Sequence, residues 1–215
     1  MFKLAVNTEF SKSDLAGILS EFNLGNLIDV KPIEKGNVQT NYILITEKNK
    51  LVFRYYENRS LDSVLFEVDL IKKLNKHNFP CPHIFKNKSE EYINTFKDKP
   101  FTIFNFIEGE HMKNLNEIQS NNLLQTMAEL HNITFNYKPS KTKYRLNYDP
   151  ETCKKLAQEK VKVLDTLNSK KKLKWFKNEL NKLILPDCLP KGVCHCDFHY
   201  TNILFKNNKV KAFLD

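Results

Sequence analysis

The sequence predicts an α+β fold in which strands dominate the first half of the chain and helices most of the second. Apolar, β-prone runs occupy residues 33–45, 51–56 and 101–107, with the length and composition of strands. Apolar residues at helical spacing instead mark 120–131 and 150–185. A chain of 215 residues with 41% hydrophobic content can form one large domain or two small lobes with a buried core.

A first helix is expected after Ser11, because Asp14 follows at capping-box spacing and apolar residues share one face from Leu15 to Phe22, before Gly25 ends the helix. The next segment, 33–45, is typical of a strand, a turn containing Gly36 and a second strand. Backbone amides in such a turn can hold phosphate oxygens. An ordinary hairpin is an equal interpretation of this pattern.

The third strand, 51–56, carries the cation Arg54 among apolar neighbours. A buried charge needs an anionic partner, and Glu67 is a candidate on the following helix, whose apolar stripe runs from Val64 to Ile71. The alternative is that both side chains are exposed. Phe79-Pro80-Cys81-Pro82 is expected to end this helix, because proline lacks a backbone donor and restricts the residue before it.

The apolar run 101–107 is typical of a buried strand, and Glu108-Gly109 interrupts it. We interpret the interruption as a linker between an N-terminal lobe, 1–104, with a hinge at 105–109, and a C-terminal lobe, 110–215.

Helices dominate the expected second lobe. Ser120 is a candidate cap for a helix that reaches His131, and two further helices are expected between Pro150 and Leu185, with Trp175 in their core.

The stretch from Val193 to Asn202 is the most informative part of the chain. His195, Asp197 and Asn202 follow the order H-x-D-x-x-x-x-N, which is the spacing of phosphoryl-transfer loops with aspartate as base and asparagine as metal ligand. The alternative is that His195 and Asp197 form a buried pair that stabilises a turn.

A hairpin is expected directly after this loop, with Asn207-Asn208 as its turn. In the simplest register Asn202 faces Phe213, so the carboxylate of Asp215 approaches the Asn202 amide. Oxygen ligands of this kind suit Mg²⁺. Asp215 could instead be simply the end of a strand.

Composition limits the remaining classes. The net charge is +9, but the lysines are dispersed, so a nucleic-acid-binding module is a weaker hypothesis and we expect no nucleic-acid partner. No apolar run reaches the roughly 20 residues that span a bilayer, and the apolar N-terminal stretch is too short for a signal peptide, so we expect a cytoplasmic protein without membrane contact.

Five cysteines at irregular spacing argue against a disulfide framework. A zinc site at Cys194, His195 and Cys196 is also disfavoured, because strand alternation would separate the cysteines from the histidine.

Motifs along nearly the whole chain match one known family. They are Phe22-Asn23-Leu24-Gly25, Gly36 to Tyr42, Phe79-Pro80-Cys81-Pro82, Phe106-Ile107-Glu108-Gly109, Leu130-His131, Leu189 to Val193, and His195, Asp197, Asn202 and Asp215. With these motifs the chain resembles the aminoglycoside-phosphotransferase-like small-molecule kinases, and most closely their homoserine kinase branch.

The resemblance implies a protein-kinase-like bilobal fold, with an antiparallel sheet and a helix in the N-terminal lobe and a mostly helical, incomplete C-terminal lobe. It implies transfer of the γ-phosphoryl group of ATP, with Mg²⁺, to a hydroxyl group of a small molecule. The first expectation is L-homoserine, giving O-phospho-L-homoserine for threonine synthesis. Choline-type and aminoglycoside-type acceptors are alternatives.

Roles follow from the resemblance position by position. Asp197 and His195 would be catalytic, with Asp197 accepting the hydroxyl proton, and Asn202 and Asp215 would hold Mg²⁺. The nucleotide would meet Gly36, Thr40, Asn41, Arg54, Glu67, Asn105, Phe106 and Ile107, with Arg54 on the phosphates, Glu67 orienting it, and 105–107 beside adenine.

The sequence departs from the family at Gln39, Tyr200 and Thr201, where relatives often have Asn, Pro, and Asp or Gly. Relatives also continue beyond the metal-binding aspartate, whereas this sequence stops at Asp215. We therefore hypothesise a truncated or split product, with a non-catalytic nucleotide-binding remnant as the alternative to an active kinase.

Overall fold

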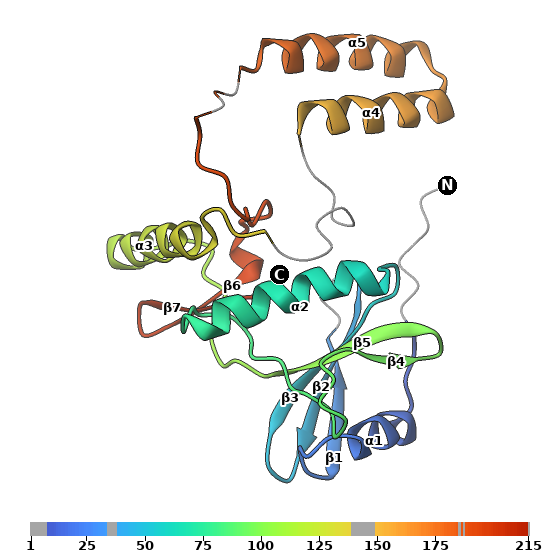
Figure 1. Cartoon of the computed structure of the whole chain (residues 1–215), viewed down its shortest axis with the longest axis vertical. Coiled ribbons are helices and arrows are strands. Elements are labelled where there is room, and N and C mark those ends of the chain that lie inside the picture. Colours follow the sequence, from blue (N-terminus) through green and yellow to red (C-terminus); the bar gives the residue numbers. More distant parts are fainter. Residues whose placement is uncertain (1–7, 34–37, 139–148, 185, 187, 215) are drawn as a thin grey trace. The chain divides into compact units, whose positions relative to one another are not determined.

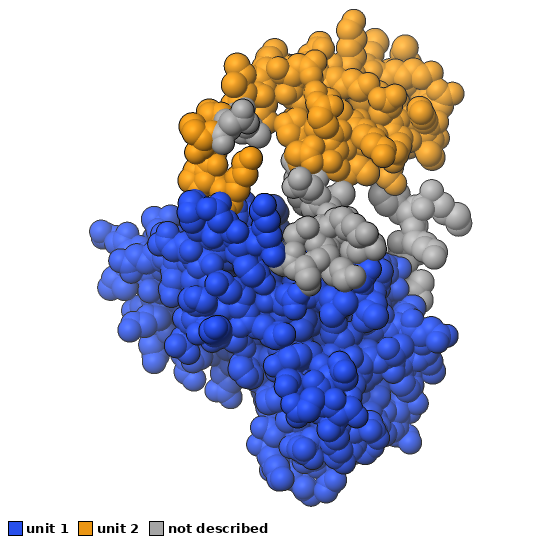
Figure 2. Space-filling view, in the orientation of Figure 1, with its two compact units in different colours: residues 1–144, 192–215 blue, residues 145–191 orange. Residues whose placement is uncertain are grey.

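A computed structural model describes residues 8–33, 38–138, 149–184, 186 and 188–214. The chain divides into two compact units, one formed by 1–144 with 192–215 and the other by 145–191 (Figure 2). No described helix is both long and apolar enough to cross a membrane.

A five-stranded antiparallel sheet is the centre of the first unit (Figure 1). Its spatial order is β1-β2-β3-β5-β4. The expected strands at 51–56 and 101–107 are confirmed within one or two residues. The first strand was expected to begin at Ile33, but the observed strand lies earlier in the sequence and ends at Pro32. The strands are β1 (Leu27–Pro32), β2 (Thr40–Thr46), β3 (Lys50–Tyr55), β4 (Asn94–Phe96) and β5 (Lys99–Asn105).

Helices α1 (Lys12–Ser20) and α2 (Leu61–Lys76) supply separate apolar clusters to this sheet. Side chains of a strand alternate between its two faces. Accordingly, Phe101 and Ile103 of β5 join the cluster of α1, while Phe104 joins that of α2. Packing on both faces therefore fixes the position of the sheet, and with it the positions of the polar residues on β3 and α2.

The predicted capping signal of α1 is confirmed. Ser11 and Asp14 form the predicted capping box of α1, although the helix ends at Ser20 and not at Gly25. Gly25 lies beyond it with a φ of 90°, a conformation that favours glycine. Helix α2 ends before Phe79-Pro80, as expected.

Helix α3 (Glu117–Thr134) begins one turn earlier than predicted. Asn116, not Ser120, is its N-cap, and Asn116 and Gln119 form a complete capping box. Both positions carry a good capping residue, but only Asn116 has a capping-box partner three residues later, because Leu123 stands at that place after Ser120. The inward face of α3 includes Leu123, Met127 and Leu130, which pack against the hairpin of β6 (Ile203–Lys206) and β7 (Lys209–Phe213).

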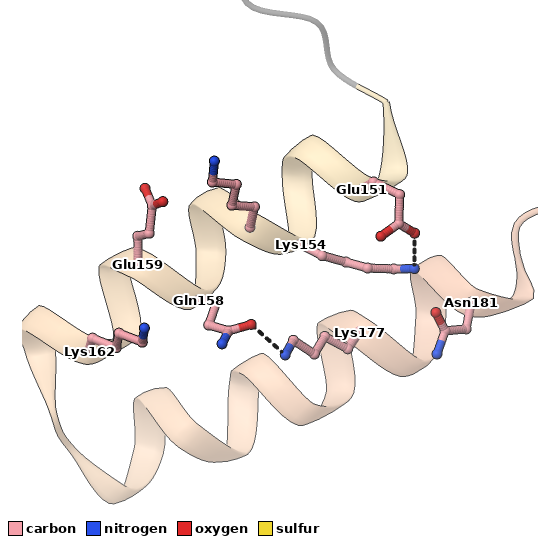
Figure 3. A pocket seen from close by; sticks show the side chains of 8 residues that line it. Glu151, Lys154, Gln158, Glu159, Lys162, Lys177 and Asn181 are labelled. Carbon is pink, nitrogen blue, oxygen red and sulfur yellow. Dashed lines mark hydrogen bonds and ion pairs between the residues drawn. The ribbon is translucent and has the colours of Figure 1, made fainter.

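The second unit is a pair of helices, α4 (Pro150–Leu164) and α5 (Leu167–Lys182), as predicted. The expectation that Trp175 belongs to a core is wrong, because this side chain is 63% exposed and lies off the half-buried stripe of Leu173, Phe176 and Leu180. Polar pairs such as Lys177 with Gln158 line the groove between the helices (Figure 3).

Candidate active site

The H-x-D-x-x-x-x-N segment brings Asp197 and Asn202 into direct contact. Asn202 Nδ2 donates to Asp197 Oδ2 and to the Asp197 carbonyl oxygen, each at 3.0 Å. A short 3₁₀ helix, η2 (Tyr200–Asn202), makes this contact possible because it folds the chain back after Asp197. Asp197 is exposed, so its carboxylate is accessible to a substrate hydroxyl.

His195 is half-buried among aromatic side chains. Its ring centroid lies 5.7 Å from that of Phe198 and 5.7 Å from that of Phe213 on β7. The strand alternation expected at Cys194 and Cys196 is wrong, because 192–199 forms no strand and Cys196 has a left-handed φ of 60°.

The hairpin after the loop has the predicted turn but a different register. Asn207 and Asn208 have φ values of 50° and 62°, and Phe205 pairs with Val210 as expected. A bulge then shifts the pairing, so that Ile203 and not Asn202 faces Phe213.

The shifted register leaves Asn202 opposite the residue before Asp215. The amide of Leu214 donates to the Asn202 carbonyl oxygen at 2.9 Å. Asp215 itself lies outside the described residues. The predicted approach of the Asp215 carboxylate to the Asn202 amide therefore stays a prediction.

The predicted partnership of Arg54 and Glu67 is confirmed. Arg54 Nη1 lies 3.1 Å from Glu67 Oε1, with side chains 18% and 13% exposed, so the alternative of two exposed charges is wrong. Sequence reasoning missed two further partners of Glu67. The Tyr56 hydroxyl donates to Oε1 at 2.7 Å, and Arg59 forms an ion pair with Oε2.

Arg54 connects the sheet to the C-terminal end of the hairpin of β6 and β7. Its Nε donates to Asn41 Oδ1 on β2 at 3.3 Å, and its Nη2 donates to the Leu214 carbonyl oxygen at 3.4 Å. The Arg54 guanidinium group thus contacts two predicted site residues, Asn41 and Glu67. It reaches Asn202 only indirectly, through the backbone of Leu214.

The other residues predicted to bind the nucleotide differ in their environments. Thr40 is buried and donates to Glu57, and Gly36 lies outside the described residues. Asn105 and Phe106 already donate their backbone N–H groups to His83 and Lys50 carbonyl oxygens, each at 3.0 Å. These two N–H groups are therefore engaged within the protein and are not available to a base, while Ile107 is half-buried.

His111, which sequence reasoning also missed, supports the loop from behind. Its Nδ1 lies 3.2 Å from the Tyr200 carbonyl oxygen and 3.0 Å from that of Ile203. A carbonyl oxygen only accepts, so Nδ1 must carry the proton. His111 therefore holds the backbone on both sides of Asn202, two residues before it and one residue after it.

Gly192 allows the loop to start close to α3. A Cβ at this position would lie 2.8 Å from the Thr134 carbonyl oxygen, and Thr134 Oγ1 also donates to the Val193 carbonyl oxygen at 3.3 Å. Only glycine fits without a shift of the backbone.

The donor set suits a hard cation. The Asn202 amide nitrogen is engaged by Asp197, so the amide oxygen, Oδ1, is the atom that remains for a metal. Asp197 adds an exposed carboxylate beside it. Oxygen donors of this type bind Mg²⁺ together with phosphate oxygens.

Comparisons with known proteins agree with this geometry. The sequence model described as the phosphotransferase enzyme family matches residues 29–215. Homoserine kinases from Bartonella henselae and Rhodopseudomonas palustris (strain BisB5) are 25% and 27% identical to this chain. Each alignment covers 99% of this chain but only 66% and 65% of the relative, so the chain spans about two thirds of their length.

Solved structures give the same fold. A spectinomycin phosphotransferase in complex with ADP and spectinomycin has a TM-score of 0.72, covering 97% of this chain and 69% of that protein at 14% identity. The amicoumacin kinase hAmiN, in complex with AMP-PNP and Ca²⁺, has a TM-score of 0.69, covering 95% of this chain and 63% of that protein, again at 14% identity. The kinase-like α+β fold expected from the sequence is confirmed.

Proposed function

The chain belongs to the phosphotransferase enzyme family, and from that premise we propose that it transfers the γ-phosphoryl group of ATP to a hydroxyl group of a small molecule. The contact between Asp197 and Asn202 carries this proposal. It joins an exposed carboxylate, the base required by a hydroxyl acceptor, to an oxygen ligand for the metal.

Each residue then has a defined task. Asp197 orients the acceptor hydroxyl and takes its proton, with His195 packed behind the loop, while Asn202 and Asp215 hold Mg²⁺. Bound Mg²⁺ neutralises charge on the phosphates. Arg54, oriented by Glu67, binds phosphate oxygens, and this transfer depends on such positioning more than on covalent chemistry.

The nucleotide lies between two lobes in this proposal, which keeps 1–104 as the N-terminal lobe, 105–109 as the hinge and 110–215 as the C-terminal lobe. Gly36, Thr40 and Asn41 cover the phosphates. Asn105, Phe106 and Ile107 border the adenine.

L-Homoserine is the acceptor that we propose first, because the homoserine kinases align with 99% of this chain. The product would be O-phospho-L-homoserine, and the reaction would belong to threonine synthesis in the cytoplasm. A choline-type or aminoglycoside-type acceptor is the second candidate, supported by the fold shared with a spectinomycin phosphotransferase.

ADP release from Mg-ATP, measured with L-homoserine and a panel of amino alcohols, tests the proposal. Asp197→Asn preserves shape and removes the base, and we expect a loss of about 10²-fold or more in kcat. Asp98→Asn, at an exposed carboxyl group in the turn between β4 and β5, is a matched control outside the site, expected to keep wild-type kcat. Turnover that Asp197→Asn leaves intact would contradict the assigned base. Mg-ATP binding without turnover on any acceptor would support a nucleotide-binding remnant instead.

A further inference from the structure

Glu57 is a buried carboxylate to which the proposed reaction gives no task. It lies two residues after the end of β3, and its side chain is only 2% exposed. An unpaired charge at such a depth would be strongly unfavourable. The carboxylate is instead surrounded by donors from three separate segments of the chain.

These donors occupy both oxygens of the carboxylate. Oε1 accepts from the Thr8 backbone N–H at 2.7 Å and from the Thr40 hydroxyl at 2.6 Å, and Oε2 accepts from Lys99 Nζ at 2.6 Å. The backbone N–H of Glu57 also donates to Gln39 Oε1 at 2.9 Å. A single residue thus fixes Thr40, the first residue of β2, and Gln39, which precedes it.

The first residues of β2 lie beside Arg54, the residue that we propose binds phosphate. Thr40 pairs with Tyr55 across the sheet, and the next pair is Asn41 with Arg54. Asn41 Oδ1 in turn accepts from Arg54 Nε. The position of Asn41, and with it one of the contacts that orient the Arg54 guanidinium, depends on how firmly Thr40 is held.

We propose that Glu57 is a positioning residue for nucleotide binding, acting through Thr40 and Asn41 on Arg54. The inference rests on the proposed function, because it assumes that Arg54 meets nucleotide phosphates. A buried ion pair is often no more stabilising than apolar packing of the same volume. We therefore assign the carboxylate a geometric role, which is to fix the position of the start of β2.

Titration of Mg-ATP into the full chain by calorimetry tests the inference in Glu57→Gln and Thr40→Val. Glutamine keeps the shape but presents an NH₂ group to donors, and valine removes only the hydroxyl. We expect the Kd for Mg-ATP to rise about tenfold in Glu57→Gln and about threefold in Thr40→Val, as for a lost charged and a lost neutral hydrogen bond. Glu129→Gln, an exposed carboxylate on α3, is the matched control and should keep the wild-type Kd.

Kinetics separate positioning from a loss of folded protein. Positioning raises the KM for ATP and leaves kcat at saturating ATP within about twofold, whereas partial unfolding lowers kcat at unchanged KM. An unchanged Kd in folded Glu57→Gln overturns the inference. If Glu57→Gln does not fold, Thr40→Val decides, and an unchanged Kd there overturns it too. A wild-type chain that binds no Mg-ATP overturns the proposed function itself, before any variant is compared.

Discussion

Replacing Tyr56 with phenylalanine measures how strongly the ion-pair cluster around Glu67 depends on a neutral hydroxyl. The hydroxyl donates to Glu67 Oε1 at 2.7 Å and lies 3.2 Å from Thr102 Oγ1. Tyr56 and Thr102 are both 0% exposed. Phenylalanine keeps the ring and leaves no large cavity, so the substitution removes one polar group and little else.

The size of the effect follows from these contacts. A hydrogen bond to a charged group contributes about 1.5–3 kcal/mol. Glu67 keeps Arg54 and Arg59 as partners, which limits the penalty at its carboxylate, whereas the buried Thr102 hydroxyl loses a neighbour. We expect the free energy of unfolding to fall by about 2 kcal/mol, equivalent to about 4–8 °C in Tm for a chain of this size.

Urea unfolding followed by circular dichroism measures this change, and the KM for ATP reports its effect on Arg54. Tyr92→Phe, at a half-buried tyrosine, is the matched control and should stay within about 0.5 kcal/mol of the wild type. If Tyr56→Phe also stays within that range, the hydroxyl does not orient Glu67, and the account given for the cluster is refuted.

The wild type and Tyr56→Phe should also differ in how their stability changes at alkaline pH. Burial raises the pKa of Tyr56 above its ordinary value of 10.0, and the charge of Glu67 raises it further. The unfolded chain therefore releases this proton at a lower pH than the folded chain, so stability is lost as pH rises above about 10, by up to about 1.4 kcal/mol per pH unit. Tyr56→Phe should lack this component, and identical slopes between pH 9 and 11 would contradict it.

Three further predictions concern residues around the site. Gly192→Ala forces a Cβ to 2.8 Å from the Thr134 carbonyl oxygen, so we expect about 1–3 kcal/mol lower stability and a lower kcat; wild-type values in both assays would rule out the close approach. His111→Ala should lower kcat about tenfold with a small change in Tm, and His111→Asn, which can still donate, should recover part of it; equal loss in both would exclude the hydrogen bond as the cause. Burial acts to raise the pKa of Glu57, but hydrogen bonds from Lys99, Thr40 and Thr8 outweigh it and hold the pKa below the ordinary value of 4.5. Its contribution to stability is present above about pH 4.5 and is lost as pH falls further, so urea unfolding of Glu57→Gln should show a shallower acid slope than the wild type, and parallel slopes would count against this role.

Contacts between candidate site residues were predictable where the two partners lie close together in the sequence. Asp197 and Asn202 are five residues apart, so their spacing alone predicts a loop that brings them together. Arg54 and Glu67 are 13 residues apart on a strand and the following helix. Their partnership was predictable because a cation among apolar neighbours requires an anion nearby.

The parts that could not be predicted depend on tertiary contacts. A bulge in the hairpin changes which residue faces Phe213, and neither the turn residues nor the apolar alternation encodes that extra residue. Tyr56 was expected only as the last residue of a strand, and no role was expected for Glu57. Only the folded structure shows that the first supports Glu67 and the second supports Thr40. The start of α3 is a different case, because its signal is local and was overlooked: Gln119 completes a capping box with Asn116, whereas Ser120 has no such partner.

The hydrogen bond from Arg54 to the Leu214 carbonyl oxygen joins residues 160 positions apart, whereas the ion pair of Arg54 with Glu67 spans 13. Closing the longer loop costs about 2 kcal/mol more chain entropy. Each half of the site can therefore assemble early and locally, while their junction forms late and separates first. Under mild denaturation the contact between the two halves should open while most of the secondary structure persists. A loss of ligand affinity should therefore be detectable at a lower denaturant concentration than a change in circular dichroism.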